Sequence, residues 1–139
     1  METAKQDTIL IVDDNPTNIK ILFSFMNLLA NAIDALDEDN LNKGLSYEEI
    51  KQNHNRLIIK TSVIKGAGVE IKIADNGPGI PAEMQSRIFE PFVTTKPVGK
   101  ETGLGLSICH DIIMEKHGGT LLCNSKLGEG TEFVIAIPQ

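Results

Sequence analysis

The sequence contains no tryptophan, one tyrosine and two cysteines, and aromatic residues make up only 4% of its 139 residues. Cys109 and Cys123 lie in apolar surroundings without zinc-site spacing, so we expect two reduced, packed thiols. No apolar run approaches the ~20 residues of a membrane span, and the first residues lack the charged-then-apolar form of a signal peptide. These absences predict a cytoplasmic protein without a membrane segment.

Basic residues are also in short supply. Lysine and arginine number 13 against 19 acidic residues, which gives a net charge of -6. Binding to a phosphate backbone needs a surplus of positive charge, so nucleic acid is not expected as a partner. A chain of 139 residues is long enough for one domain with a sizeable core.

The stretch Asp75-Asn-Gly-Pro-Gly-Ile80 follows an alternating apolar strand, Val69–Ala74. Gly77 and Gly79 allow the backbone to approach a bound group closely, and Asp75 can accept a hydrogen bond from the exocyclic amine of a nucleotide base. The same residues are also typical of an ordinary tight turn. Both interpretations stay open for this stretch alone.

Apolar residues recur every three or four positions from Thr17 to Leu36, which predicts an amphipathic helix. Asn27, Asn31 and Asp34 stand at i, i+4 and i+7 and therefore share one face. Amide and carboxylate oxygens in this arrangement suit a hydrated magnesium ion and its phosphates. A solvated helix face is the simpler alternative. We expect a loop from Asp37 to Arg56, interrupted by one or two helical turns where Ser46 and Glu49 have the spacing of a capping box.

A second glycine pair, Gly103 and Gly105, precedes a helical pattern from Leu106 to Lys116. Free amide donors at such a helix start attract an anion, and the helix dipole adds to the attraction. The spacing fits neither a P-loop nor a dinucleotide-binding fingerprint. Alternating apolar patterns predict two hairpins, one over 57–74 and one over 120–137. A short continuous apolar run predicts a further, buried strand over Thr8–Val12.

The run Ile-Leu-Ile-Val-Asp-Asp-Asn-Pro-Thr-Asn from Ile9 resembles the opening of a response-regulator receiver domain. The resemblance covers residues 1–25, and no later strand presents the phosphoacceptor aspartate of that family. We therefore do not expect receiver function, and Asp13 and Asp14 are interpreted as capping and solvated residues. Residues 1–25 are expected to be structurally part of one domain with residues 26–139.

The order of motifs from Met26 to Pro138 resembles the ATP-binding catalytic domain of sensor histidine kinases, within the superfamily of gyrase, Hsp90 and MutL. Met26–Leu36 resembles the N box, Asp75–Gly79 the G1 box, Phe89–Phe92 the F box and Thr102–Leu106 the G2 box. The resemblance implies a Bergerat-type α/β two-layer sandwich. Helices would cover one face of a mixed β-sheet, with ATP or ADP held between helices under a lid.

Together with the helix stripe, the resemblance implies a nucleotide site formed by Asn27, Asn31, Asp34, Asp75, Gly77, Gly79, Ile80, Lys96, Gly103, Leu104, Gly105, Leu106 and Thr131. Asn31 would ligate Mg²⁺. In the ATP-hydrolysing relatives the position of Asn27 is a glutamate base. Asparagine cannot take that proton, so we expect slow hydrolysis and assign no catalytic residue, with Asn27 as a candidate on the phosphate side.

Two departures limit what the resemblance implies. The kinase family carries its phosphoacceptor histidine on an upstream dimerising hairpin, and none of His54, His110 and His117 lies in such a motif. Glu101 stands where the G2 box commonly has glycine, and its charge would oppose a triphosphate.

We therefore expect an ATP/ADP-Mg²⁺ binding domain of two-component phosphorelay signalling, whose phosphotransferase activity needs a separate partner. That partner would be a histidine-bearing dimerisation domain or a response regulator. The alternatives are a nucleotide-poor docking module and a functionally silent chimeric or engineered scaffold.

Overall fold

The computed structural model describes residues 16–44, 46, 48–49, 55–91 and 105–138. Four described strands form one sheet in the spatial order β1-β2-β4-β3. They are β1 (Leu57–Ile64), β2 (Gly68–Asp75), β3 (Thr120–Lys126) and β4 (Gly130–Ile137). The helices are α1 (Pro16–Asn42), the short α3 (Ala82–Gln85) and α4 (Gly105–Asp111), which continues as the wider π-helical segment η1 (Ile112–Lys116).

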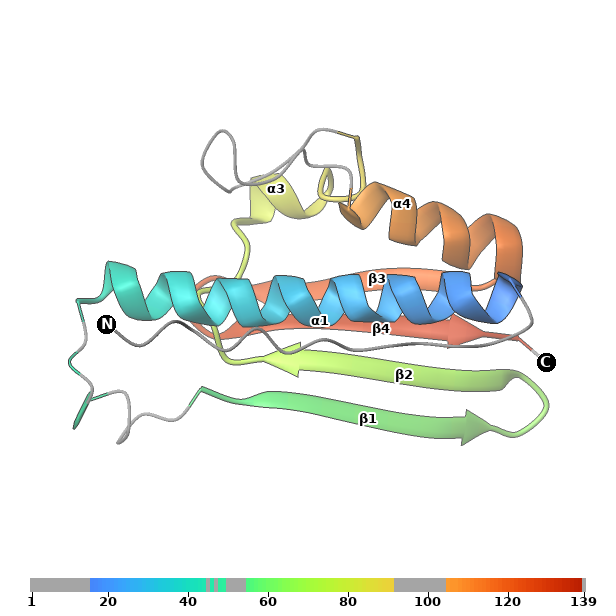
Figure 1. Cartoon of the computed structure of the whole chain (residues 1–139), viewed down its shortest axis with the longest axis horizontal. Helices are drawn as coiled ribbons and strands as arrows, with labels where there is room; N and C mark the ends of the chain where they lie inside the picture. The colour runs from blue at the N-terminus through green and yellow to red at the C-terminus, as the bar shows by residue number, and fades with distance from the viewer. Residues whose placement is uncertain (1–15, 45, 47, 50–54, 92–104, 139) are drawn as a thin grey trace.

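The helices form a second layer over one face of the sheet. α1 and α4 pack against each other and run along the strands, as Figure 1 shows. This arrangement confirms the predicted α/β two-layer sandwich and both predicted hairpins. Neighbouring strands among the four described are all antiparallel. The described sheet is therefore antiparallel where a mixed sheet was expected, and the strand expected over Thr8–Val12 lies outside the described residues.

The core lies between the helices and the three strands β2, β4 and β3. Residues directly opposite in a sheet point to the same face, so the row Ile73, Phe133 and Cys123 faces the helices together. Ile73 is 1% exposed, whereas Val69 on the same face of β2 is 38% exposed at the hairpin end. The buried cluster consists of Leu28, Ile73, Ile88, Cys109, Ile113, Leu121, Phe133 and Ile135.

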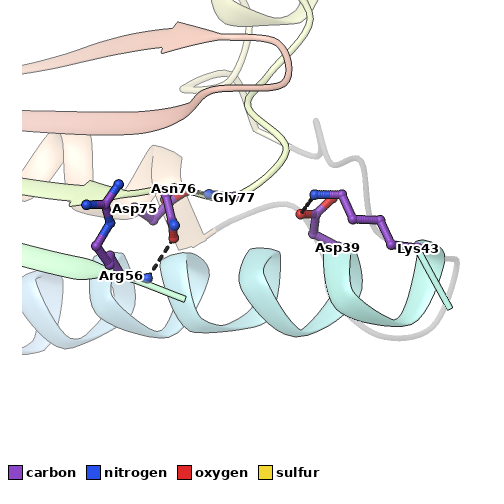
Figure 2. Close-up of polar contacts among 6 residues, drawn as sticks. All are labelled: Asp39, Lys43, Arg56, Asp75, Asn76 and Gly77. Atoms are coloured by element: carbon purple, nitrogen blue, oxygen red, sulfur yellow. Dashed lines mark hydrogen bonds and ion pairs between the residues drawn. The ribbon is translucent and has the colours of Figure 1, made fainter. Parts of the chain in front are cut away.

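Helix α1 extends further than the sequence pattern predicts. It reaches Asn42, so the prediction of a loop from Asp37 is wrong over the first six residues of that segment. Lys43 pairs with Asp39 one turn earlier at 2.7 Å (Figure 2), and Gly44 follows with a φ of +60°. The apolar periodicity ends before the helix does, because polar residues continue a helix wherever nothing breaks it.

Ser46 and Glu49 form the capping box that their spacing predicts. The Ser46 amide donates to the Glu49 carboxylate at 2.7 Å, and the Glu49 amide donates to Ser46 Oγ at 3.3 Å. Hydrogen bonding of the Glu49 carboxylate to the Ser46 backbone N–H, and to a lesser extent to the Ser46 side chain, lowers the pKa of the exposed Glu49. Among the described helices, none is both long enough and apolar enough to cross a membrane.

Ile73→Ala and Ile59→Ala form a matched pair that tests the position of the helix layer. The two isoleucines lie opposite each other, but Ile59 is 46% exposed whereas Ile73 is 1% exposed. Ile73→Ala should lower the free energy of unfolding by about 3 kcal/mol because it leaves a cavity. Ile59→Ala should lower it by about 1 kcal/mol or less, as measured by urea unfolding. Equal losses would contradict the described packing.

Candidate functional site

Asp75 ends the central strand β2, and backbone groups orient its carboxylate. Oδ1 accepts a hydrogen bond from the Gly77 N–H at 2.9 Å. Burial raises the pKa of Asp75, while the N–H groups of Gly77 and Thr131 act in the opposite direction. The strand end therefore presents a half-buried acceptor whose charged form is desolvated, and a ligand donor on its free lone pairs would offset that cost.

The turn after Asp75 requires glycine for two separate reasons. A Cβ on Gly77 would lie 2.9 Å from Asp75 Oδ1 and 3.6 Å from Leu36 Cδ2, so the missing side chain lets the turn approach α1. Gly79 has a φ of +76°, and a Cβ there would overlap the Lys126 carbonyl oxygen. The turn between β2 and α3 therefore needs glycine at two positions, because it lies close to α1 on one side and to the end of β3 on the other.

A hydrogen-bond network joins this turn to strands β3 and β4. Ser125 Oγ accepts from the Ile80 N–H at 2.8 Å and lies 2.8 Å from Thr131 Oγ1 and 2.9 Å from the Gly130 carbonyl oxygen. Thr131 pairs with Asp75 across β2 and β4 and is buried. The network brings Asp75, Gly77, Gly79, Ile80 and Thr131, all predicted site residues, to one corner of the sheet.

Asn76 fixes the same corner to the start of β1. Its Oδ1 accepts from the Arg56 N–H at 2.6 Å, and its own N–H donates to the Arg56 carbonyl at 3.3 Å. Figure 2 shows Asn76 facing Arg56, with Asp75 and Gly77 beside them. The turn is thereby tied to the open end of the first hairpin, where β1 begins and β2 ends.

The predicted polar stripe of α1 is not uniformly solvated. Asn27 and Asn31 are half-buried, and only Asp34 is exposed. The Asn27 side chain lies within hydrogen-bonding reach of the Cys109 thiol, whose Sγ donates to the Ser24 carbonyl at 3.5 Å. Asn27 therefore lies where α1 meets α4, and the stripe runs from this contact to an exposed position at Asp34.

The remaining predicted site residues divide into two groups. Gly105 and Leu106 begin α4, next to the described part of α1. Lys96, Gly103 and Leu104 lie outside the described residues. Of the F box, Phe89 is described. Its ring stacks on His110 with 5.0 Å between centroids and meets the edge of Phe133 at 6.5 Å.

Neither cysteine of the pair is arranged for chemistry. Both are free thiols, as predicted. Burial raises the pKa of Cys109, and burial together with the nearby Asp75 charge raises the pKa of Cys123 to about 11. Both therefore stay protonated at neutral pH. In the part of the chain that the structure describes, no cluster of three or more His, Cys, Asp or Glu is placed to hold a metal ion.

Sequence reasoning missed Ser125, Gln85 and Arg56. Ser125 contacts Ile80 from 45 residues away, Gln85 contacts it from five residues away, and Arg56 contacts Asn76 from 20 residues away. A polar serine on the core-facing row of β3 was the one available signal. It has no meaning until the register of the sheet is known.

Comparison with known proteins identifies the family. The model of the histidine kinase-, DNA gyrase B- and HSP90-like ATPase family matches residues 18–139. The chain belongs to this family. Among curated relatives, the sensor kinase CckA of Brucella abortus is 38% identical over 118 residues, which is 82% of this chain and 12% of that protein. The sensor histidine kinase ZraS of Escherichia coli K12 is 37% identical over 113 residues, 81% of this chain and 20% of that protein.

Solved structures of the same family share the fold. The catalytic domain of the histidine kinase ThkA superimposes with a TM-score of 0.64 at 32% identity, over 86% of this chain and 66% of that one. Full-length ShkA in complex with AMPPNP gives a TM-score of 0.66 at 27% identity, over 86% of this chain and 21% of that one. Of the two curated relatives named above, the chain spans only one eighth and one fifth of the length, respectively.

The comparisons correct one interpretation of the N-terminus. The ATPase family model already covers the chain from residue 18 on. The resemblance of residues 1–25 to a receiver domain therefore has no support. Both families have a polar turn followed by an amphipathic helix at this point, and so short a motif does not distinguish them.

Asp75→Asn tests the site by separating binding from stability. Burial raises the folded-state pKa of Asp75 above its ordinary value of 3.8, so the stability that the protonated carboxyl contributes is lost as the pH rises through the folded-state pKa. The amide still accepts from Gly77 but bears no charge. The variant should therefore be at least as stable as the parent at pH 7, with the difference vanishing below pH 3.8, as measured by urea unfolding across pH.

The same variant should lose adenine nucleotide binding. Its side-chain oxygen stays bonded to the Gly77 N–H, so its NH₂ group would face the exocyclic amine of adenine, and two donors cannot form a hydrogen bond with each other. A variant that loses stability at pH 7 and still binds nucleotide would contradict the described role of Asp75.

Proposed function

We propose that the chain binds ATP or ADP with Mg²⁺ as the catalytic domain of a cytoplasmic sensor histidine kinase of two-component signalling. The observation that carries this proposal is the half-buried Asp75 carboxylate at the end of β2, with one oxygen held by Gly77 in a chain of the histidine kinase-like ATPase family. Family membership disfavours the docking module and the silent scaffold. Neither alternative would explain why the Asp75 carboxylate is placed to accept a hydrogen bond from a nucleotide.

The adenine end of the site is proposed to lie at the corner around Asp75. Because Oδ1 is occupied by the Gly77 N–H, the remaining carboxylate lone pairs are the natural acceptors for the exocyclic amine of adenine. Gly77, Gly79 and Ile80 would supply the wall against the ring, and Thr131 would border it from β4. Lys96, Gly103 and Leu104 are proposed as phosphate contacts only because of their positions in the family's sequence motifs.

The phosphate end is proposed to lie along the α1 stripe. Asn31 is a half-buried amide on the flank of α1 that carries Asn27, and its oxygen is a ligand that Mg²⁺ accepts. The described residues offer no carboxylate cluster for a metal. The other ligands would then come from the nucleotide phosphates and water, which is usual for Mg²⁺. Asp34, exposed at the end of the stripe, would act through that hydration shell.

Asn27 sets what the bound nucleotide is used for. An amide at this position cannot remove a proton from water, and its side chain lies beside the Cys109 thiol, which stays protonated. Hydrolysis should be slow. The γ-phosphoryl group would instead go to an acceptor on another domain, either a histidine-bearing dimerisation domain or, through it, a response regulator. Gly105 and Leu106 would present backbone N–H groups toward the phosphates at the start of α4.

Asn31→Ala tests this assignment by calorimetry with ATP and ADP, each in Mg²⁺ and in EDTA. The parent should bind with a Kd of about 1–100 μM in Mg²⁺ and more weakly in EDTA. Asn31→Ala should bind equally in both buffers, at the parent's EDTA level. Asp37→Ala, an exposed change on the same helix, should behave like the parent. No binding by the folded parent would overturn the proposed function, and Mg²⁺-dependent binding by Asn31→Ala would overturn the role of Asn31.

We also propose that residues 1–25 are structurally part of the same domain. Among the described strands none pairs with the outer edge of β1, and Ile58 and Val63 on its two faces are 44% and 74% exposed. An apolar edge of this kind invites pairing. The five-residue apolar run Thr8–Val12, which ends shortly before α1, is the candidate strand.

Removal of residues 1–13 tests that proposal. The shortened chain should unfold about 5 °C lower or more. It should also show faster amide exchange along β1 and concentration-dependent self-association, while β3 exchange stays unchanged. A shortened monomer with the parent's melting temperature and β1 protection would refute the assignment.

A further inference from the structure

Gln85 connects three segments that are far apart in the sequence. It is the last residue of α3, and its Nε2 donates to the Ile80 carbonyl at 2.8 Å and to the Ser125 carbonyl at 2.9 Å. Both partners are carbonyl oxygens, so only the NH₂ end of the amide satisfies them, and each of its two N–H groups is used. One partly buried side chain thus joins the turn after β2, α3 and strand β3.

The Ile80 peptide groups are held from two sides. The Ile80 N–H donates to Ser125 Oγ at 2.8 Å, while its carbonyl accepts from Gln85. One residue earlier along the turn, Gly79 packs against the Lys126 carbonyl, and the Gly128 N–H donates to the Pro78 carbonyl at 2.7 Å. The turn therefore has little freedom to move away from the hairpin of β3 and β4 as long as Gln85 is bonded.

A second path leads from Gln85 to the carboxylate. Gln85 fixes the Ser125 backbone, Ser125 Oγ lies 2.8 Å from Thr131 Oγ1, and Thr131 pairs with Asp75 in the sheet. The Thr131 N–H is one of the two backbone donors that bear on the Asp75 carboxylate. Gln85 thus reaches the corner of the sheet both through Ile80 and through Ser125, without lying at the corner itself.

We propose that Gln85 is a positioning residue for the base end of the nucleotide site. This inference rests on the proposed function. By holding Ile80 and the Ser125–Thr131 pair, Gln85 sets the distance between the wall of the turn and the Asp75 carboxylate. A base that contacts both the turn and the carboxylate needs this distance to be held. Loss of Gln85 therefore weakens binding of adenosine and of ADP by the same factor, because the phosphates do not contribute to this step.

Gln85→Leu keeps the size of the side chain and removes both donors. Calorimetry at a temperature where the variant is fully folded should show a Kd about tenfold higher for adenosine and for MgADP alike, which corresponds to about 1.4 kcal/mol. Amide exchange at Ile80 should accelerate, while exchange at Ile135 in the core stays unchanged. Gln85→Glu, which points a carboxylate at two carbonyl oxygens, should weaken binding at least as much.

Two further variants separate positioning from general stability. Ile88→Val shortens a core side chain three residues further on and should lower the melting temperature while leaving both Kd values at the parent's level. Ser125→Ala interrupts the same path from the other side. Combined with Gln85→Leu, it should weaken binding by less than the product of the single effects, because the two residues act through shared partners.

The outcomes distinguish this inference from the proposed function. If the parent binds MgADP and Gln85→Leu and Ser125→Ala both bind it equally well, the positioning role is wrong and the proposed function stands. A tenfold loss for MgADP with no loss for adenosine would also overturn it, since the effect would then lie at the phosphates. If the folded parent binds neither ligand, the proposed function fails, and this inference fails with it.

Discussion

The half-buried carboxylate of Asp75 is the constraint on which the rest of the structure depends. A charge at the end of a central strand is desolvated, and it persists in a fold only where donors face it. Strand β2 lies between β1 and β4, so neighbouring strands occupy both of its edges. The turn after Asp75 therefore leaves the sheet on the side of α1, and it has to do so without covering the carboxylate. Gly77 allows that approach, and its N–H is itself one of the donors.

Much of this arrangement could be predicted from the sequence because it is local. The alternation in residues 69–74 predicted strand β2 and its end at Asp75, and the three-to-four spacing from Thr17 predicted α1. The glycines of the turn, the capping box of Ser46 and Glu49 and the two hairpins follow from short-range backbone preferences. The order of these motifs was enough to indicate the family that the comparisons then identified.

The parts that could not be predicted are non-local. Nothing in the composition of β1 shows that Ile59 lies beyond the helix layer while Ile73, directly opposite, is fully covered. The contacts of Ser125 with Ile80 and with Gln85 join positions 45 and 40 residues apart, and they depend on the register of β3 against β4. The extension of α1 to Asn42 was missed for a different reason. Apolar periodicity shows which part of a helix is buried, and it does not show where the helix ends. A ten-residue likeness to a receiver domain failed because both folds use the same strand-to-helix turn.

The nucleotide site at the corner around Asp75 is tested most directly by an amide chemical-shift map of the chain during titration with MgADP. We expect saturable shifts at Gly77, Ile80 and Thr131, at the side-chain amide of Asn31 and at the start of α4. The amides of Glu70 and Lys72, near the far hairpin end of β2, should not move. Shifts centred on β1 or on the outer face of the sheet, or no shifts in a folded chain, would contradict the claim that the corner around Asp75 is a nucleotide site.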